Sequence, residues 1–350
     1  MKKQELFFYE SIKEAIRTAM LEDEGVICFG LGTTDPKGIF GTTQGLEKEF
    51  GNLRVFDTPV SENCLTGVAI GLGISGFKPI LSHQRLDFAL LSMDQIVNNA
   101  AKWKFMFGRK NDVSITIRMI VGRGWGQGPT HSQNLHALFC HIPGLKVLCP
   151  SFPNDAAKML LSAISDDSPT VFIEHRWLHG QKGKVNIPVK KTIIKPQRIS
   201  SGDDITVVSS SYATVEALNA INLLRKEKVT IDLIDLKILK PLNFKLILSS
   251  IKKTKRLLVL DTGHFTGSIA HNIVSYVVCN QTDILKSPPK VLAIPDFPEP
   301  TSSSLLKNYH VNAINISKTC LKMMGKKVPS GFDTRKMQID TPGDWFKGPF

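Results

Sequence analysis

Glu62 is the first side chain in the sequence whose position suggests chemistry. It follows a strand-like run and a proline turn, and it comes directly before the glycine-rich, apolar segment 67–76, which predicts a closely packed helix. Open α/β sheets bind ligands at the carboxyl ends of their strands, so a carboxylate here predicts a fixed acid in a binding site. The alternative is that Glu62 only caps the helix that follows it.

His131 is the second candidate, at the end of a loop whose glycines alternate with other residues, 122–128. Such a loop lets backbone approach a ligand closely, and a histidine can act near neutral pH as an acid, a base or a hydrogen-bond donor. The glycines match neither a Walker loop nor a dinucleotide fingerprint, so no phosphate site is predicted by motif. A flexible loop with an incidental histidine is the alternative interpretation.

The surrounding chain alternates between helical periodicity and short apolar runs. Residues 9–21 place apolar side chains on one helical face, and residues 26–30 are typical of a buried strand closed by glycine. This alternation predicts a mostly parallel sheet covered by helices. The further expected strands are 114–120, 146–149 and 170–174, and the further expected helices are 93–107 and 154–165.

A chain of 350 residues is long enough for two domains. Between residues 180 and 202 the pattern gives way to Lys, Pro and polar residues, as in a linker. Strand-like and helical segments then alternate again, so the second domain is also expected to be α/β. We therefore expect domains at 1–185 and 204–328, a linker at 186–203, and an extended polar tail at 329–350.

Composition excludes several classes of protein. No stretch approaches the roughly 20 apolar residues of a membrane-spanning helix, and the first residues do not resemble a signal peptide, so we expect a cytoplasmic protein without a membrane partner. The six cysteines form no CxxC or Cys/His cluster, which indicates neither zinc nor disulfides. The net charge of +13 comes from dispersed lysines without interleaved aromatic residues, which favours a solvated surface over a nucleic-acid site.

Several segments, in register, resemble one known family. The runs RVFDTPVSE, GFKPI, MDQIVNNAAK, THSQ, HIPGLKV and SPTVFIEH are similar to the beta subunits of pyruvate and branched-chain 2-oxo acid dehydrogenases, with looser similarity over residues 5–325. The spacing from Glu62 to His131 fits that family without gaps. The resemblance implies an N-terminal thiamine-diphosphate pyrimidine-binding fold with a mostly parallel sheet and a transketolase C-terminal-like domain.

The resemblance also implies roles for individual residues. Glu62 matches the glutamate that hydrogen-bonds a ring nitrogen of the cofactor's aminopyrimidine and so activates the cofactor. Phe88 matches the aromatic residue stacked on that pyrimidine, although it could be an ordinary core residue, and Val60 matches a cofactor-binding position. His131 matches the histidine that assists acyl transfer to a lipoyl group. The implied reaction is oxidative decarboxylation of pyruvate or a branched-chain 2-oxo acid.

Partners and metals follow from the same resemblance. The family holds the cofactor diphosphate through Mg²⁺ at a GDG segment, and this chain contains no GDG. A separate alpha subunit is therefore implied, in an α2β2 heterotetramer that could dock on a lipoyl acyltransferase core. The positions that match the family's monovalent-cation site, for K⁺, are Ile115, Ala163, Asp166 and Ser168. Asp166 could equally be a turn residue.

Two segments depart from the family pattern. Gly30-Leu31-Gly32 lacks the usual acid after the first strand, and Ser82-His83-Gln84-Arg85-Leu86 replaces acidic and aromatic residues, which indicates a changed pocket and substrate. Two alternatives follow: a stand-alone thiamine enzyme of specialised biosynthesis that uses the same half-site, or a catalytically silent scaffold. The presence of Glu62, Phe88 and His131 together favours an enzyme.

Overall fold

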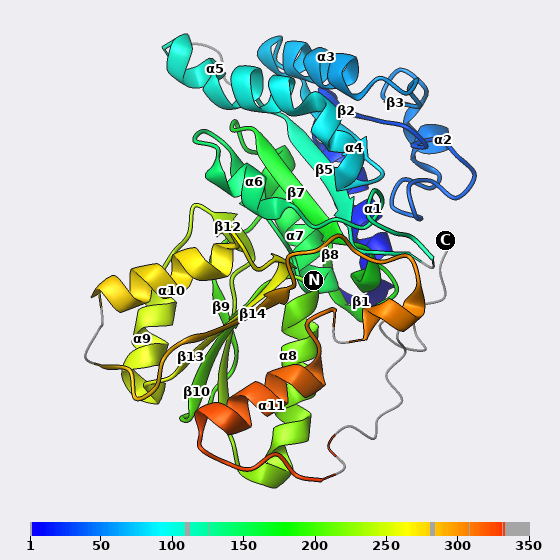
Figure 1. Cartoon of the computed structure of the whole chain (residues 1–350). Coiled ribbons are helices and arrows are strands. Elements are labelled where there is room, and N and C mark those ends of the chain that lie inside the picture. Colours follow the sequence, from blue (N-terminus) through cyan, green and yellow to red (C-terminus); the bar gives the residue numbers. More distant parts are fainter. Residues whose placement is uncertain are drawn as a thin grey trace.

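The computed structural model describes residues 2–108, 113–124, 126–280, 284–307, 309–330 and 332. These residues form two α/β domains, which are the upper and lower halves of Figure 1. The tail expected at 329–350 lies outside the described residues except for positions 329, 330 and 332. No helix in the described part of the chain is long and apolar enough to cross a membrane.

The first domain is built on a seven-stranded sheet with the order β12-β6-β7-β5-β4-β2-β3. All neighbouring strands are parallel except β12 and β6, which confirms the expected mostly parallel sheet. Its strands are β2 (Val26–Phe29), β3 (Val55–Phe56), β4 (Lys78–His83), β5 (Thr116–Val121), β6 (Lys146–Leu148), β7 (Thr170–His175) and β12 (Ile238–Lys240).

Helices cover both faces of this sheet because successive strand residues point to opposite sides (Figure 1). In β2, Ile27 and Phe29 pack on the α3 side, whereas Val26 and Cys28 pack on the α1 and α7 side. The helices are α1 (Phe8–Glu22), α2 (Leu46–Phe50), α3 (Glu62–Ile74), α4 (Leu86–Ala89), α5 (Ala101–Met106), α6 (His136–His141) and α7 (Pro153–Ile164). A separate antiparallel pair joins β1 (Lys2–Phe7) and β8 (Lys182–Ile187).

The second domain has a five-stranded sheet with the order β14-β13-β10-β11-β9, parallel except at β9. Ile205 and Val207 of β10 pack on the α8 and α11 side, and Val208 packs on the α9 and α10 side. The strands are β9 (Gln197–Ser200), β10 (Ile205–Ser209), β11 (Ile231–Asp235), β13 (Leu257–His264) and β14 (Lys290–Ile294). The helices are α8 (Tyr212–Leu224), α9 (Lys245–Thr254), α10 (Ile269–Asn280) and α11 (Ala313–Met323).

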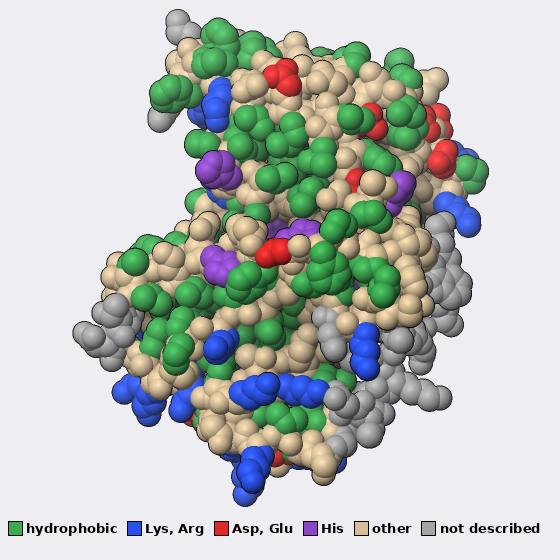
Figure 2. Space-filling model, viewed as in Figure 1, with side chains coloured by type: hydrophobic (Ala, Val, Ile, Leu, Met, Phe, Trp, Pro, Cys, Tyr) green, Lys and Arg blue, Asp and Glu red, His purple; other side chains and the backbone are tan. Residues whose placement is uncertain are grey.

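The two domains also differ in surface charge. Figure 2 shows Lys and Arg side chains gathered over the lower half, where the second domain lies, while the acidic side chains of this face are mainly in the upper half. On this face, the basic side chains therefore lie mainly on the second domain.

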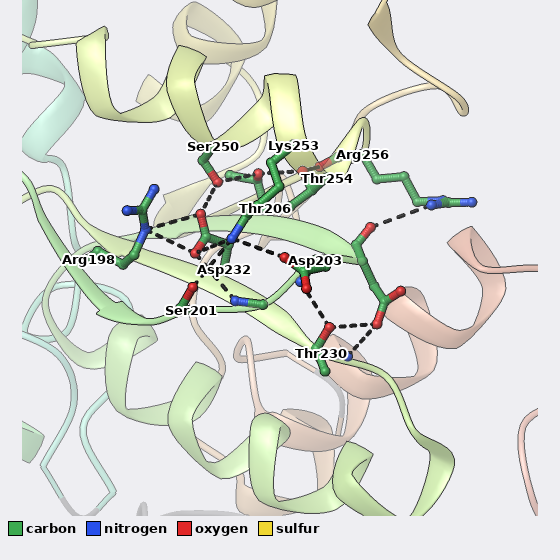
Figure 3. Close-up of polar contacts among 12 residues, drawn as sticks. Arg198, Ser201, Asp203, Thr206, Thr230, Asp232, Ser250, Lys253, Thr254 and Arg256 are labelled. Atoms are coloured by element: carbon green, nitrogen blue, oxygen red, sulfur yellow. Dashed lines mark hydrogen bonds and ion pairs between the residues drawn. The ribbon is translucent and has the colours of Figure 1, made fainter.

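Asp232, buried on β11, is the centre of a polar network inside the second domain (Figure 3). Its carboxylate pairs with Arg198 of β9 at 3.0 Å and with Lys253 of α9 at 3.5 Å. It also accepts a hydrogen bond from the Ser250 hydroxyl, which in turn is hydrogen-bonded to the Thr206 hydroxyl of β10 at 2.6 Å. These charges are satisfied by one another, so the network joins the sheet to α9 and offers no obvious ligand site.

A shared strand connects the domains. β12 follows β11 in the chain but pairs with β6 of the first sheet. Beside it, Ser151 donates to the carboxylate of Asp235 at 2.9 Å, from one domain to the other. Burial raises the pKa of Asp235 to about 7. The contact between the domains therefore contains both a continuous sheet and a buried titratable group.

Two local expectations differ from the structure. The helix expected at 93–107 is interrupted, because Gln95–Ala100 forms a π-helical segment before α5. The segment 180–202 contains β8 and β9, which the sequence does not predict. Both are edge strands with mostly exposed or half-buried side chains, so they lack the apolar signal of a central strand.

Candidate active site

A cavity with about 330 Å³ of empty space, part of it open to solvent, lies at the carboxyl ends of β2, β3 and β4. Glu62 enters it from the first residue of α3, and Phe88 enters it from α4. This is the edge at which parallel α/β sheets bind ligands. The lining residues are Gly30, Leu31, Thr58, Pro59, Ser61, Glu62, Leu65, Leu81, Ser82, His83, Gln84 and Phe88.

Hydrogen bonds between neighbouring loops fix the walls of this cavity. Asp57, just after β3, accepts the backbone amides of Gly32 at 2.8 Å and of Thr58 at 2.7 Å. Gln84, just after β4, donates through its side-chain amide to the Leu31 carbonyl at 3.0 Å. Gly30 has φ of +146°, and a side chain there would collide with the Ser82 carbonyl. The three strand ends are thus held as one unit.

The contacts of Glu62 with the described residues do not assign its carboxylate to a hydrogen bond within the fold. It is half-buried in the first turn of α3, where a carboxylate is favoured by the helix dipole. No described donor forms a hydrogen bond with its side chain, while its backbone carbonyl accepts the Thr66 hydroxyl at 2.8 Å. The carboxylate is therefore available to a ligand in the cavity. Its structural contribution to α3 is limited to the favourable interaction with the helix dipole.

Phe88 and His131 come together although they are far apart in the sequence. Their rings lie 5.2 Å apart, centroid to centroid, and are perpendicular. His131 is exposed, and its Nδ1 is 3.1 Å from the Thr130 hydroxyl. Gln133 donates through its side-chain amide to Asp87, next to Phe88, at 2.8 Å. The loop of His131 is thereby held against α4.

The second domain also holds this loop. Asn134 donates to the Thr262 hydroxyl at 2.5 Å, and His136 Nε2 is 3.0 Å from the buried Asp261 carboxylate. Burial acts to raise the pKa of Asp261, but His136 and two backbone amides together lower it. The position of His131 therefore depends on both domains.

A buried ion pair lies beneath the cavity. Arg118 of β5 and Glu174 of β7 are 2.6 Å apart, with both side chains fully buried. Arg118 also donates to Ser82 at 3.1 Å and to Thr42 at 2.8 Å. Burial acts to raise the pKa of Glu174, but the nearby Arg118 charge and the His179 hydrogen bond lower it. Through Ser82, this pair supports the cavity wall at the end of β4.

The four positions expected to hold a monovalent cation lie around the end of α7. Asp166 pairs with Lys146 at 2.5 Å and accepts the Ser168 amide at 2.8 Å. The carbonyls of Ala163 and Ile115 accept backbone amides at 3.1 and 2.9 Å, from Asp166 and Thr170. Among the described residues, no group of three or more His, Cys, Asp or Glu side chains is arranged to hold a metal ion.

The structure thus places Glu62 and Phe88 in one cavity and His131 against Phe88. Val60 is 73% exposed in the loop before α3 and does not line the cavity. Sequence reasoning assigned no role to Thr58 or His83, which line the same cavity and each carry a buried polar atom without a hydrogen-bond partner among the described residues. The unusual run from Ser82 to Leu86 is the one signal that pointed toward His83.

Comparisons with known proteins agree with this architecture. Residues 5–181 match the family "Transketolase, pyrimidine binding domain", and residues 195–316 match "Transketolase, C-terminal domain". A split-gene transketolase, solved as an inactive beta4 tetramer, superposes with a TM-score of 0.75 at 19% identity, over 92% of this chain and 99% of that one. Transketolase from Campylobacter jejuni gives a TM-score of 0.66 at 15% identity, over 92% of this chain and 47% of that one. The fold and site define a transketolase-type, two-domain protein.

Curated relatives narrow the family further. The chain is 34% identical over 299 residues to the pyruvate dehydrogenase E1 component subunit beta of Rickettsia bellii, which covers 85% of this chain and 92% of the relative. It is 36% identical over 329 residues to the acetoin:2,6-dichlorophenolindophenol oxidoreductase subunit beta of Cupriavidus necator, which covers 90% and 96%. The chain belongs to the transketolase-like family of thiamine-diphosphate-dependent 2-oxo acid dehydrogenase beta subunits.

Proposed function

We propose that this chain is the beta subunit of a thiamine-diphosphate-dependent enzyme that decarboxylates a 2-oxo acid and transfers the acyl group to a lipoyl group. The observation that carries the proposal is the single cavity that collects Glu62 and Phe88, with the His131 ring against Phe88. An acid, an aromatic wall and a second proton-transferring group are what activation of an aminopyrimidine and a later transfer step require.

The described residues fit an aminopyrimidine. Phe88 provides an aromatic wall, and the buried Thr58 Oγ1 and His83 Nε2 lack hydrogen-bond partners among the described residues. Orphaned polar atoms in a cavity of this kind are expected where a ligand with a polar edge binds. When bound, thiamine diphosphate supplies the carbanion-stabilising chemistry of decarboxylation.

Each site residue then has a distinct task. The start of α3 fixes the position of the Glu62 carboxylate, which would hold a proton against a ring nitrogen of the aminopyrimidine if the cofactor were bound. Phe88 packs on the ring and orients it, and Val60, exposed beside the cavity, adds apolar contact. His131 is exposed and its ring lies against Phe88, where it can donate a proton or a hydrogen bond during acyl transfer.

A second chain completes the site in this proposal. The sequence has no GDG segment, so Mg²⁺ and the diphosphate are assigned to an alpha subunit in an α2β2 heterotetramer. Exposed apolar side chains before α3, on α3 and after α4 support a covering partner, because Val60, Val68 and Leu91 are 73%, 48% and 64% exposed. Docking of that assembly on a lipoyl acyltransferase core is part of the proposal.

A monovalent cation at the end of α7 is a further part of the proposal. Asp166 already pairs with Lys146, so K⁺ must share that carboxylate with the ammonium group. If K⁺ binds there, KCl raises the melting temperature more than choline chloride does at equal ionic strength, and Asp166→Asn removes the difference. Equal melting temperatures for the wild type in the two salts would contradict the site.

The acyl donor has two candidates. Pyruvate is the first, with branched-chain 2-oxo acids next to it, and relatives named as pyruvate dehydrogenase subunits support it. Acetoin, which would be cleaved, is the second candidate, because relatives named as acetoin oxidoreductase subunits are equally similar to this chain. The changed run from Ser82 to Leu86 lines or adjoins the cavity, so it is where a difference in substrate would be expressed.

The test is turnover with the proposed alpha subunit, co-expressed with this chain and purified as a complex. Pyruvate, branched-chain 2-oxo acids and acetoin are each supplied with thiamine diphosphate and Mg²⁺, with either lipoamide or a dye as acceptor. Turnover that needs both chains supports the proposal and identifies the donor and acceptor. A stable complex that binds the cofactor but turns over none of these compounds would contradict this function and favour a specialised acceptor or a scaffold.

A further inference from the structure

His83 is a buried polar residue in the wall of the candidate site. It ends β4, is 5% exposed and lines the same cavity as Glu62 and Phe88. Its Nε2 atom forms no hydrogen bond with any described residue. A buried polar group without a hydrogen-bond partner is energetically costly, so such groups are uncommon and point to a missing ligand or water.

The ring of His83 is neutral in this environment. Burial lowers its pKa to about 4. A neutral imidazole carries one donor and one acceptor nitrogen, so Nε2 can pair with either kind of ligand atom, depending on the tautomer. His83 therefore suits an uncharged ligand edge with mixed donors and acceptors better than an anion.

The other buried polar groups of the cavity leave few atoms for a ligand. The Gln84 amide is used by the Leu31 carbonyl, and the Ser82 hydroxyl accepts a hydrogen bond from Arg118. In the cavity lining, Thr58 Oγ1 and His83 Nε2 are the buried side-chain atoms without a hydrogen-bond partner among the described residues. Thr58 lies in the loop after β3, whereas His83 is the last residue of β4, so the two side chains belong to different walls of the cavity.

We propose that His83 is a further cofactor-contacting residue of this site, which hydrogen-bonds through Nε2 with the aminopyrimidine held between Glu62 and Phe88. This inference rests on the proposed function. An aminopyrimidine offers an amino donor and ring-nitrogen acceptors, which match the capacities of the neutral imidazole. His83 thus adds a polar contact on the β4 side of the ring, separate from Glu62 on α3.

The test uses the complex with its alpha subunit and measures thiamine-diphosphate binding, with Mg²⁺ present, by calorimetry. His83→Leu removes the hydrogen-bonding atom with little change in apolar bulk, and His83→Gln keeps a donor and an acceptor. Loss of one hydrogen bond between uncharged groups predicts roughly 3- to 10-fold weaker binding for His83→Leu. His83→Gln recovers part of that loss, and His141→Leu, an exposed histidine outside the cavity, serves as the matched control.

A second readout separates binding from folding. Because His83 is unsatisfied without ligand, His83→Leu should keep or raise the melting temperature of the cofactor-free complex while reducing the increase that the cofactor produces. Wild type that binds cofactor while His83→Leu binds equally well would overturn this inference alone. A lower cofactor-free melting temperature with an unchanged cofactor-induced increase would also overturn it. Wild type that binds no cofactor would overturn the proposed function, and this inference with it.

Discussion

Replacing Glu174 with glutamine tests the buried ion pair beneath the cavity. The substitution keeps the shape of the side chain and removes its charge. Arg118 makes two hydrogen bonds with Glu174, at 2.6 and 3.0 Å, and its other described partners, Ser82 and Thr42, are uncharged. Glu174→Gln therefore leaves a fully buried guanidinium without a countercharge.

The expected loss in the free energy of unfolding is large. Breaking one side of a buried pair costs about 3–5 kcal/mol because the remaining charge stays desolvated. With an unfolding entropy of about 2.1 cal/mol/K per residue over 350 residues, this loss corresponds to a drop of about 4–7 °C in melting temperature. The assay is differential scanning calorimetry at neutral pH.

A matched control and a pH series sharpen this test. Glu49→Gln breaks the exposed pair with Arg17, which is 2.8 Å long, and should cost less than about 1 kcal/mol. Because Glu174 has a lowered pKa in the folded chain, its contribution is present above the unfolded pKa and is lost as pH falls through the folded pKa. Equal effects of Glu174→Gln and Glu49→Gln would refute the reasoning from burial.

Two further predictions concern the domain contact and the cofactor. The pKa of Asp235 is raised to about 7 in the folded chain, so its favourable contribution is present below about pH 4 and is lost as pH rises toward 7. The free energy of unfolding of the wild type should therefore fall by on the order of 4 kcal/mol between acidic pH and pH 8, and Asp235→Asn should not show this fall, as measured by urea unfolding. Parallel pH profiles for variant and wild type would contradict this. Phe88→Leu should weaken thiamine-diphosphate binding roughly 2- to 10-fold by titration calorimetry, whereas His131→Leu should leave binding unchanged and slow acyl transfer; unchanged affinity in Phe88→Leu would argue that the ring is only a core residue.

Periodicity predicted most central elements because their side chains are buried on both faces. The strand at 170–174 and the helix at 154–165 correspond to β7 and α7 within a residue or two. The edge strands β8 and β9 were not predictable from apolar pattern, since most of their side chains are exposed or half-buried. The pairing of β12 with β6 is a contact between segments far apart in the chain, which local pattern does not encode.

The site was predictable to a similar degree. Glu62 and His131 each stand after a strand-like run, and the resemblance placed Phe88 between them. The contact between the Phe88 and His131 rings depends on how the loop of His131 is held by Asp87 and Thr262, which are distant in sequence. The unpaired Nε2 of His83 could not be predicted from sequence, because only the three-dimensional structure shows that this atom is buried without a hydrogen-bond partner among the described residues.

The central claim is that Glu62 acts on a cofactor and does more than begin a helix. The most direct measurement is turnover and melting temperature of Glu62→Gln in the complex with the alpha subunit, beside Glu47→Gln, which changes another first-turn acid on α2 outside the cavity. Loss of the proton-sharing group predicts at least about 100-fold lower turnover for Glu62→Gln, with a melting temperature like that of Glu47→Gln. Wild-type turnover in Glu62→Gln, or loss of turnover only in proportion to loss of fold, would contradict the account.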